Sequence, residues 1–151
     1  FLSAMAIAFS FLRLGGLLLF ISGFFDLMDG ALARHTNHLT KFGGFLDSVL
    51  DRYTDLFVTY GIFIFFLKHG EILYCVITFI ASIGIAIIPY VRARAEASLL
   101  TCNTGLLERP ERIILLLIGL FLHLLPYVMV VLAVLTHVTV LQRILFVRKH
   151  S

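Results

Sequence analysis

Long apolar runs dominate this chain and restrict the folds that it can adopt. Residues 72–91 and residues 113–142 contain no Asp, Glu, Lys or Arg. Of the 151 residues, 60% are hydrophobic and only 14% are charged, whereas soluble domains average about a quarter charged. We therefore expect an integral membrane protein. Because backbone groups in lipid need internal hydrogen-bond partners, the fold class we expect is an all-α bundle.

The hydropathy pattern predicts six transmembrane helices in one domain that spans residues 1–151. We expect the first helix to be truncated, because Phe1 already lies within an apolar run, and to end at Arg13. The N-terminus is therefore expected to be incomplete. The run 113–142 is too long for one straight helix, and Pro126 after His123 predicts a turn between two antiparallel helices. The other three helices are expected at residues 14–34, 43–67 and 72–91.

Basic residues predict how the helices are oriented in the membrane. Only Arg13 and Lys68 fall on one side of the predicted bundle. The positive-inside rule places the richer side in the cytoplasm, with both termini. We expect a plasma-membrane protein whose polar site faces the cytoplasm. The basic residues on that side are Arg34, Lys41, Arg52, Arg92, Arg94, Arg109, Arg112, Arg143, Arg148 and Lys149.

Regularly spaced carboxylates lie where two predicted helices reach the cytoplasmic side. Asp26 and Asp29 are three residues apart, and Asp47, Asp51 and Asp55 follow at intervals of four, so each set shares one helix face. Carboxylates in membrane segments indicate a functional site. Their oxygen atoms suit Mg²⁺, Mn²⁺ or Ca²⁺, and two divalent ions would balance four carboxylates. Such a pair can support phosphoryl transfer.

Small residues accompany these carboxylates. Gly30 and Ala33 share the face of Asp26, and Gly43 begins the next predicted helix. Small side chains allow a nucleotide to approach the backbone, and Arg34 could neutralise its phosphates. Gly16 and Gly23 precede Gly30 at intervals of seven, and a stripe of this kind favours close helix packing.

Together these residues resemble the signature of the CDP-alcohol phosphotransferases. The matching pattern is Asp26-x-x-Asp29-Gly30-x-x-Ala33-Arg34, then eight residues, then Gly43-x-x-x-Asp47-x-x-x-Asp51. The resemblance implies an enzyme that moves a phosphate-linked group from a CDP-alcohol to a second alcohol and releases CMP. It implies a homodimer, which is common in the family.

The resemblance also implies roles for individual residues. Two divalent cations would be held by Asp26, Asp29, Asp47 and Asp51, and Asp51 would also deprotonate the acceptor hydroxyl. We expect Arg52 and Asp55 to support this site. The residues implied in CDP binding are Asp29, Gly30, Ala33, Arg34, Gly43 and Asp47.

Three arginines indicate the acceptor. Arg92, Arg112 and Arg143 lie at the cytoplasmic ends of three predicted helices. If they converge beside the carboxylates, they would suit an acceptor that carries its own phosphate. The alternative is that they only anchor the helices at the interface. The segments YVRARAEA and ERPERI resemble the branch that uses myo-inositol phosphate, which contains phosphatidylinositol-phosphate synthases and archaetidylinositol-phosphate synthases. The lipid donor would be CDP-diacylglycerol or CDP-archaeol.

Other functions stay open from the sequence. The same motif could serve another acceptor or a soluble donor such as CDP-inositol. A divalent-cation transporter would also use intramembrane carboxylates, although all of these lie near one membrane face rather than at the midplane. A catalytically inert anchor would not need an intact motif. The small net charge of +3 gives no indication of a nucleic-acid partner.

Overall fold

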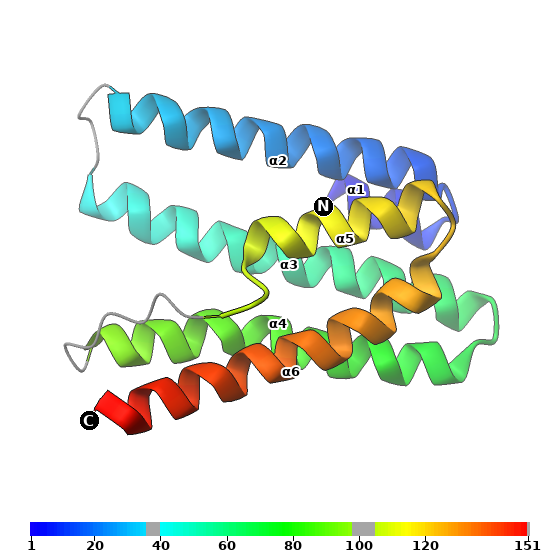
Figure 1. Cartoon of the computed structure of the whole chain (residues 1–151). Coiled ribbons are helices and arrows are strands. Elements are labelled where there is room, and N and C mark those ends of the chain that lie inside the picture. The colour runs from blue at the N-terminus through cyan, green and yellow to red at the C-terminus, as the bar shows by residue number, and fades with distance from the viewer. Residues whose placement is uncertain (36–39, 98–104, 151) are drawn as a thin grey trace.

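The chain folds into a bundle of helices (Figure 1). The computed structural model describes residues 1–35, 40–97 and 105–150, apart from the side chains of residue 27, residues 29–35 and residue 41. The predicted all-α class is confirmed. The described residues form six helices: α1 (Leu2–Ala8), α2 (Leu12–His35), α3 (Lys41–Lys68), α4 (Ile72–Ala97), α5 (Arg109–Phe121) and α6 (Leu125–His150).

The order in which the helices pack determines which ends meet. The short α1 packs against α2 and α3, and α4 packs against both α3 and α6. The helix α5 contacts α2 and α6. Within the described residues α2 contacts α1 and α5 rather than α3, so the two acid-bearing helices are connected through other elements.

The turn predicted within the last apolar run is present. The helices α5 and α6 are separated by three residues, among which His123 adopts a positive φ of 57°. Pro126 lies in the first turn of α6, where a missing N–H is tolerated, rather than in the turn itself. The expected first boundary was wrong. The chain turns at Ser10, with a φ of 69°, so Arg13 belongs to the start of α2.

Within the part of the chain that the structure describes, two helices, α4 and α6, are long and apolar enough to cross a membrane. Large apolar side chains are exposed along both, for example Phe79 on α4 and Val134 on α6, as expected of surfaces that face lipid. The spans predicted for the remaining helices, and the cytoplasmic placement of the termini, stay predictions.

Small residues set the closest helix contacts. A Cβ at Gly84 of α4 would collide with the Thr136 side chain of α6, so these two backbones approach closely. A Cβ at Gly16 would lie 3.3 Å from the Leu120 Cβ of α5, and Gly23 also faces α5. The predicted glycine stripe therefore packs within the chain as far as Gly23, while Gly30 lies outside the described side chains.

Candidate active site

The acidic face of α3 starts from a well-defined helix end. Thr40 is the N-cap, and its hydroxyl oxygen accepts a hydrogen bond from the Gly43 N–H at 3.0 Å. Such a cap satisfies one of the free N–H groups of the first turn. From this start Asp51 and Asp55 lie one turn apart on the same face, and both are largely shielded from solvent.

Arg109 connects the carboxylates of two helices that do not pack on each other. Its Nη2 lies 3.1 Å from Asp26 Oδ2 on α2, and its Nη1 lies 2.7 Å from Asp51 Oδ1 on α3. Its Nε is 3.8 Å from Asp55 Oδ1. One guanidinium at the start of α5 thus gathers three carboxylates around it.

Arg112 lies one turn further along α5 and is only 4% exposed. Its Nη2 donates a hydrogen bond to Asp55 Oδ2 at 3.0 Å. Its Nη1 is buried and has no hydrogen-bond partner among the described residues. A buried donor without an acceptor is costly, so this nitrogen is suited to an anionic ligand.

The segment before α5 is fastened to α6, and this places both arginines. The Leu107 N–H donates to Thr139 Oγ1 at 3.2 Å, and the Leu106 N–H donates to Gln142 Oε1 at 3.2 Å. Gly105 has a φ of +154° and comes so close that a Cβ would lie 2.9 Å from Thr139 Cγ2. Pro110 then occupies the first turn of α5, where a residue without an N–H is tolerated.

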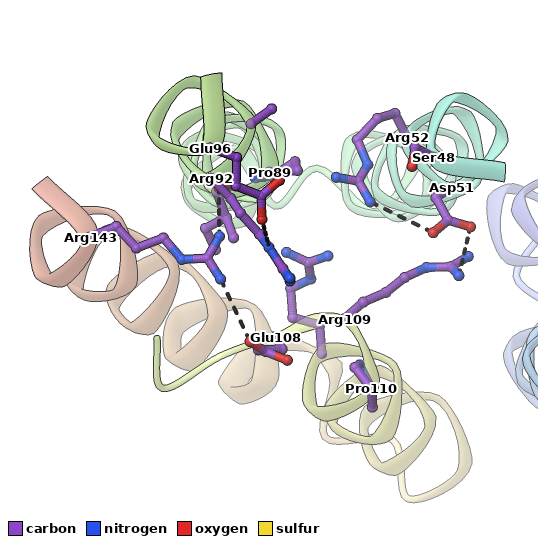
Figure 2. A pocket seen from close by; sticks show the side chains of 13 residues that line it. Ser48, Asp51, Arg52, Pro89, Arg92, Glu96, Glu108, Arg109, Pro110 and Arg143 are labelled. Carbon is purple, nitrogen blue, oxygen red and sulfur yellow. Dashed lines mark hydrogen bonds and ion pairs between the residues drawn. The ribbon is translucent and has the colours of Figure 1, made fainter. Parts of the chain in front are cut away.

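A polar cavity of about 450 Å³ lies between α3, α4, α5 and α6. Figure 2 shows Arg109 reaching across from α5 to Asp51 on α3, while Arg143 approaches from α6. The three arginines predicted for the acceptor all line this one cavity, beside Asp51. Its lining residues are Ser48, Asp51, Arg52, Ile88, Pro89, Arg92, Ala93, Glu96, Glu108, Arg109, Pro110, Arg112 and Arg143.

Two of these arginines are held differently. Arg143 is 2% exposed, donates from Nη1 to the Ile88 carbonyl at 2.8 Å, and lies 3.7 Å from Glu108 (Figure 2). Arg92 is 44% exposed, and its Nε donates to Glu96 Oε1 at 2.9 Å. The Arg143 guanidinium therefore has a fixed position, and the Arg92 guanidinium lies nearer the rim of the cavity.

An apolar groove of about 270 Å³ runs between α2 and α5 and meets the polar cavity. Arg109 and Pro110 line both spaces. Asp26 lies at the polar end of the groove. The remaining lining residues are Phe20, Gly23, Phe24, Ile113, Ile114 and Leu117.

The predicted metal ligands are described only in part. Asp26 and Asp51 converge on Arg109, and Asp47 is exposed on α3 one turn before Asp51. The backbone of Asp29 lies near the C-terminal end of α2, but its side chain is outside the described part. Within the described side chains, no group of three or more His, Cys, Asp or Glu is close enough to hold a metal ion. Asp26 on α2 and Asp51 on α3 both contact Arg109, at 3.1 and 2.7 Å, and carboxylate oxygens of this kind are the ligands that a hard divalent cation prefers.

The predicted CDP-binding residues lie at the same end of the bundle. Gly43 is exposed in the first turn of α3. Three further predicted residues lie in the last turns of α2, and their side chains are outside the described part. These residues are Gly30, Ala33 and Arg34.

Sequence reasoning assigned no site role to three charged residues of the cavity. Arg109 was assigned only to the basic side of the membrane, and Glu96 and Glu108 received no role. The spacing of Arg109 and Arg112 contains a signal, because residues three apart share a helix face. The two glutamates have no comparable signal, since their contacts depend on how α4, α5 and α6 meet.

Comparisons with known proteins agree with this geometry. The family model described as CDP-alcohol phosphatidyltransferase matches residues 1–144. The archaetidylinositol phosphate synthase of Pyrococcus horikoshii is 37% identical over 137 residues, which cover 90% of this chain and 70% of that protein. The fold resembles the crystal structure of Mycobacterium tuberculosis phosphatidylinositol phosphate synthase with CDP-DAG bound. The TM-score is 0.88 at 31% identity, covering 96% of this chain and 78% of that one. The same enzyme in complex with manganese and citrate also gives 0.88, at 32% identity, covering 96% and 75%.

Proposed function

Because the chain belongs to the CDP-alcohol phosphatidyltransferase family, we propose that it uses a CDP-lipid to phosphatidylate myo-inositol phosphate. The chain is a membrane transferase of phospholipid biosynthesis, and the acceptor and donor are the proposal. One observation carries it: the cavity that has Asp51 on one side brings together Arg92, Arg112 and Arg143. The names of the relatives indicate the same acceptor.

Charge and burial support an acceptor with its own phosphate. Among the described residues, five arginines and three carboxylates line the cavity, so their net charge is positive. If the arginines only anchored helices at the interface, their side chains would be expected in the headgroup region. Instead Arg112 and Arg143 are almost fully buried, and one nitrogen of Arg112 has no acceptor among the described residues. Phosphate oxygens would satisfy that donor.

The apolar groove supports a lipid donor. It leads from the exposed surface of α2 and α5 to Asp26 and Arg109, so a hydrocarbon chain in the groove would bring its phosphate to the carboxylates. The donor would be CDP-diacylglycerol or CDP-archaeol. A soluble donor such as CDP-inositol has no use for this groove. The CDP group would be bound by Asp29, Gly30, Ala33, Arg34, Gly43 and Asp47.

The proposed reaction is a single displacement at phosphorus. The acceptor hydroxyl oxygen forms a bond to the lipid-bearing phosphorus, and its proton goes to the Asp51 carboxylate. The P–O bond to the CMP group breaks, and its electron pair stays on the CMP phosphate. Two divalent cations held by Asp26, Asp29, Asp47 and Asp51, when bound, would neutralise the charge that develops on the phosphate oxygens.

The proposal includes the setting of the enzyme. Six spans would place the carboxylates and arginines at the cytoplasmic face of the plasma membrane, where inositol phosphate arrives from water. Two copies of the chain would form a homodimer. The transporter alternative gives no role to the buried arginines Arg112 and Arg143 beside Asp51.

The direct test is CMP release by purified protein given CDP-diacylglycerol or CDP-archaeol with Mg²⁺ or Mn²⁺. Inositol phosphate, inositol and glycerol phosphate are compared as acceptors. We expect release with inositol phosphate and a phosphorylated lipid product. Release with unphosphorylated inositol alone would overturn the acceptor and keep the chemistry. No release with any donor, acceptor or metal, from protein that still binds Mn²⁺, would overturn the enzymatic proposal.

A further inference from the structure

Arg109 occupies the junction between the two spaces that the proposed substrates would fill. It lines the polar cavity together with Asp51, and it lines the apolar groove together with Asp26. Of the described residues that line these two spaces, only Arg109 and Pro110 line both. A group that passes from a donor in the groove to an acceptor in the cavity must therefore pass beside the guanidinium of Arg109.

The contact between Arg109 and Asp51 determines how close the transferred phosphate comes to the guanidinium. Nη1 lies 2.7 Å from Asp51 Oδ1, the shortest of the three carboxylate contacts of Arg109. An acceptor hydroxyl that gives its proton to Asp51 lies within about 3 Å of the same carboxylate. Its oxygen attacks a phosphorus about 3–3.5 Å away. The non-bridging oxygens of that phosphate thus come within reach of the guanidinium.

We propose that Arg109 is a catalytic residue that donates hydrogen bonds to the non-bridging oxygens of the phosphate being transferred. The inference rests on the proposed function and adds a residue to it. The planar guanidinium has several donors, and its buried Nε has no hydrogen-bond partner among the described residues, because Asp55 is 3.8 Å away. On substrate binding, Arg109 exchanges carboxylate contacts for phosphate oxygens, whose negative charge is greatest in the transition state.

The surrounding contacts keep Arg109 ready for this role. Its helix starts at a position fixed by hydrogen bonds from Leu106 and Leu107 to α6. Carboxylates on α2 and α3 hold the guanidinium through two different nitrogen atoms. A donor that is placed beforehand needs no reorganisation during the reaction, which is the physical basis of electrostatic catalysis.

A purely structural role for Arg109 makes different predictions. In that case the arginine would only neutralise the carboxylates, and a divalent cation could do the same. Replacing Arg109 would then leave kcat unchanged once the metal was saturating. A phosphate contact predicts the reverse: a loss of kcat that added metal does not restore.

The experiment compares R109Q and R109K with the native protein at saturating CDP-lipid and Mn²⁺. We expect R109Q to lower kcat about 100-fold or more, the usual effect of removing one such donor, with little change in KM for inositol phosphate. R109K keeps the charge but not the fork of donors, and we expect a smaller loss. R148Q, an exposed arginine far along α6, is the matched control and should keep its activity.

Mn²⁺ binding followed by electron paramagnetic resonance supplies the second readout. We expect R109Q to bind Mn²⁺ at least as tightly as the native protein, because a competing cation has been removed. Full activity of R109Q, or kcat restored by raising Mn²⁺, would overturn the catalytic role. A loss of Mn²⁺ binding by R109Q would also overturn it, since Arg109 would then be organising the carboxylates. Inactivity of the native protein would count against the proposed function rather than against Arg109.

Discussion

The carboxylates and the arginines of this molecule differ in how the chain brings them together. The carboxylates come from α2 and α3, consecutive helices, and their spacing repeats every three or four residues. The arginines Arg92, Arg112 and Arg143 come from three helices and meet only because α4 and α6 pack closely and the segment before α5 is fastened to α6. The first group is a local motif, and the second is a product of tertiary packing.

Exposure varies within both groups, since Asp51 is 16% exposed and Arg92 44%, but the most exposed carboxylates and the most buried arginines indicate a division of labour. Asp26 and Asp47 are exposed at the open end of the bundle, where a nucleotide and cations can enter. Arg112 and Arg143 are buried, and their desolvated charges have a larger effect on a bound anion. We infer that the carboxylate region performs the chemistry shared by the family and that the arginine region selects the acceptor.

The sharpest test of the carboxylate region is Asp51→Asn. The amide cannot take the acceptor proton, and we expect kcat for CMP release to fall about 1,000-fold. Ser48→Ala is a matched control, because Ser48 lines the same cavity but donates its hydroxyl to the Gly44 carbonyl at 2.9 Å. Its activity should stay near the native value. Native activity in Asp51→Asn would end the assignment of Asp51 as the base.

The matching test of the arginine region is Arg112→Gln. Loss of a charge-assisted hydrogen bond of about 1.5–3 kcal/mol should raise KM for inositol phosphate about 10- to 150-fold, while kcat changes less. Steady-state kinetics at saturating CDP-lipid separate the two parameters. If kcat fell and KM stayed constant, the division of labour between the two regions would be wrong.

The packing of α4 against α6 positions Arg92 and Arg143, whereas the predicted metal-binding carboxylates lie on α2 and α3. Gly84→Leu places a side chain where the Thr136 side chain already lies, and we expect it to destabilise the protein by about 1–3 kcal/mol. Gly44→Ala is the matched control, because a Cβ there meets nothing within 4 Å. Thermal unfolding in detergent measures both. Equal unfolding temperatures for the two variants would show that the close α4–α6 contact does not limit stability.

The contrast between a local motif and a site made by tertiary packing also explains which features the sequence predicts. Apolar runs and spacing predicted the all-α class, the turn between α5 and α6, and the carboxylate face of α3, because each is determined within a few residues of the chain. The break near Arg13 was misplaced by a few residues. The charge of Arg13 was taken to mark the end of the first helix, whereas that helix ends at Ala8 and the chain turns at Ser10. The side chains of Asp29 and Arg34 lie outside the described part, so their roles stay predictions.

The contacts of the cavity could not be predicted in the same way. Arg109 contacts three carboxylates because its side chain reaches from the start of α5 to residues of both α2 and α3, and the residues next to Arg109 in the sequence do not predict these contacts. Glu108 reaches Arg143 across the start of α5 for a similar reason. The three acceptor arginines were predicted from their positions at helix ends, and their convergence had to be assumed.

The smallest effect is expected at the rim of the arginine region, from Glu96→Gln. Arg92 and Glu96 form a half-exposed pair one turn apart on α4, and such pairs contribute only about 0.3–0.5 kcal/mol to stability. Removing the negative charge should slightly favour an anion in the cavity, so KM for inositol phosphate should fall by no more than about threefold, with unfolding almost unchanged. A large rise in KM would instead show that Glu96 contacts the acceptor, which would extend acceptor selection from the buried arginines to the rim.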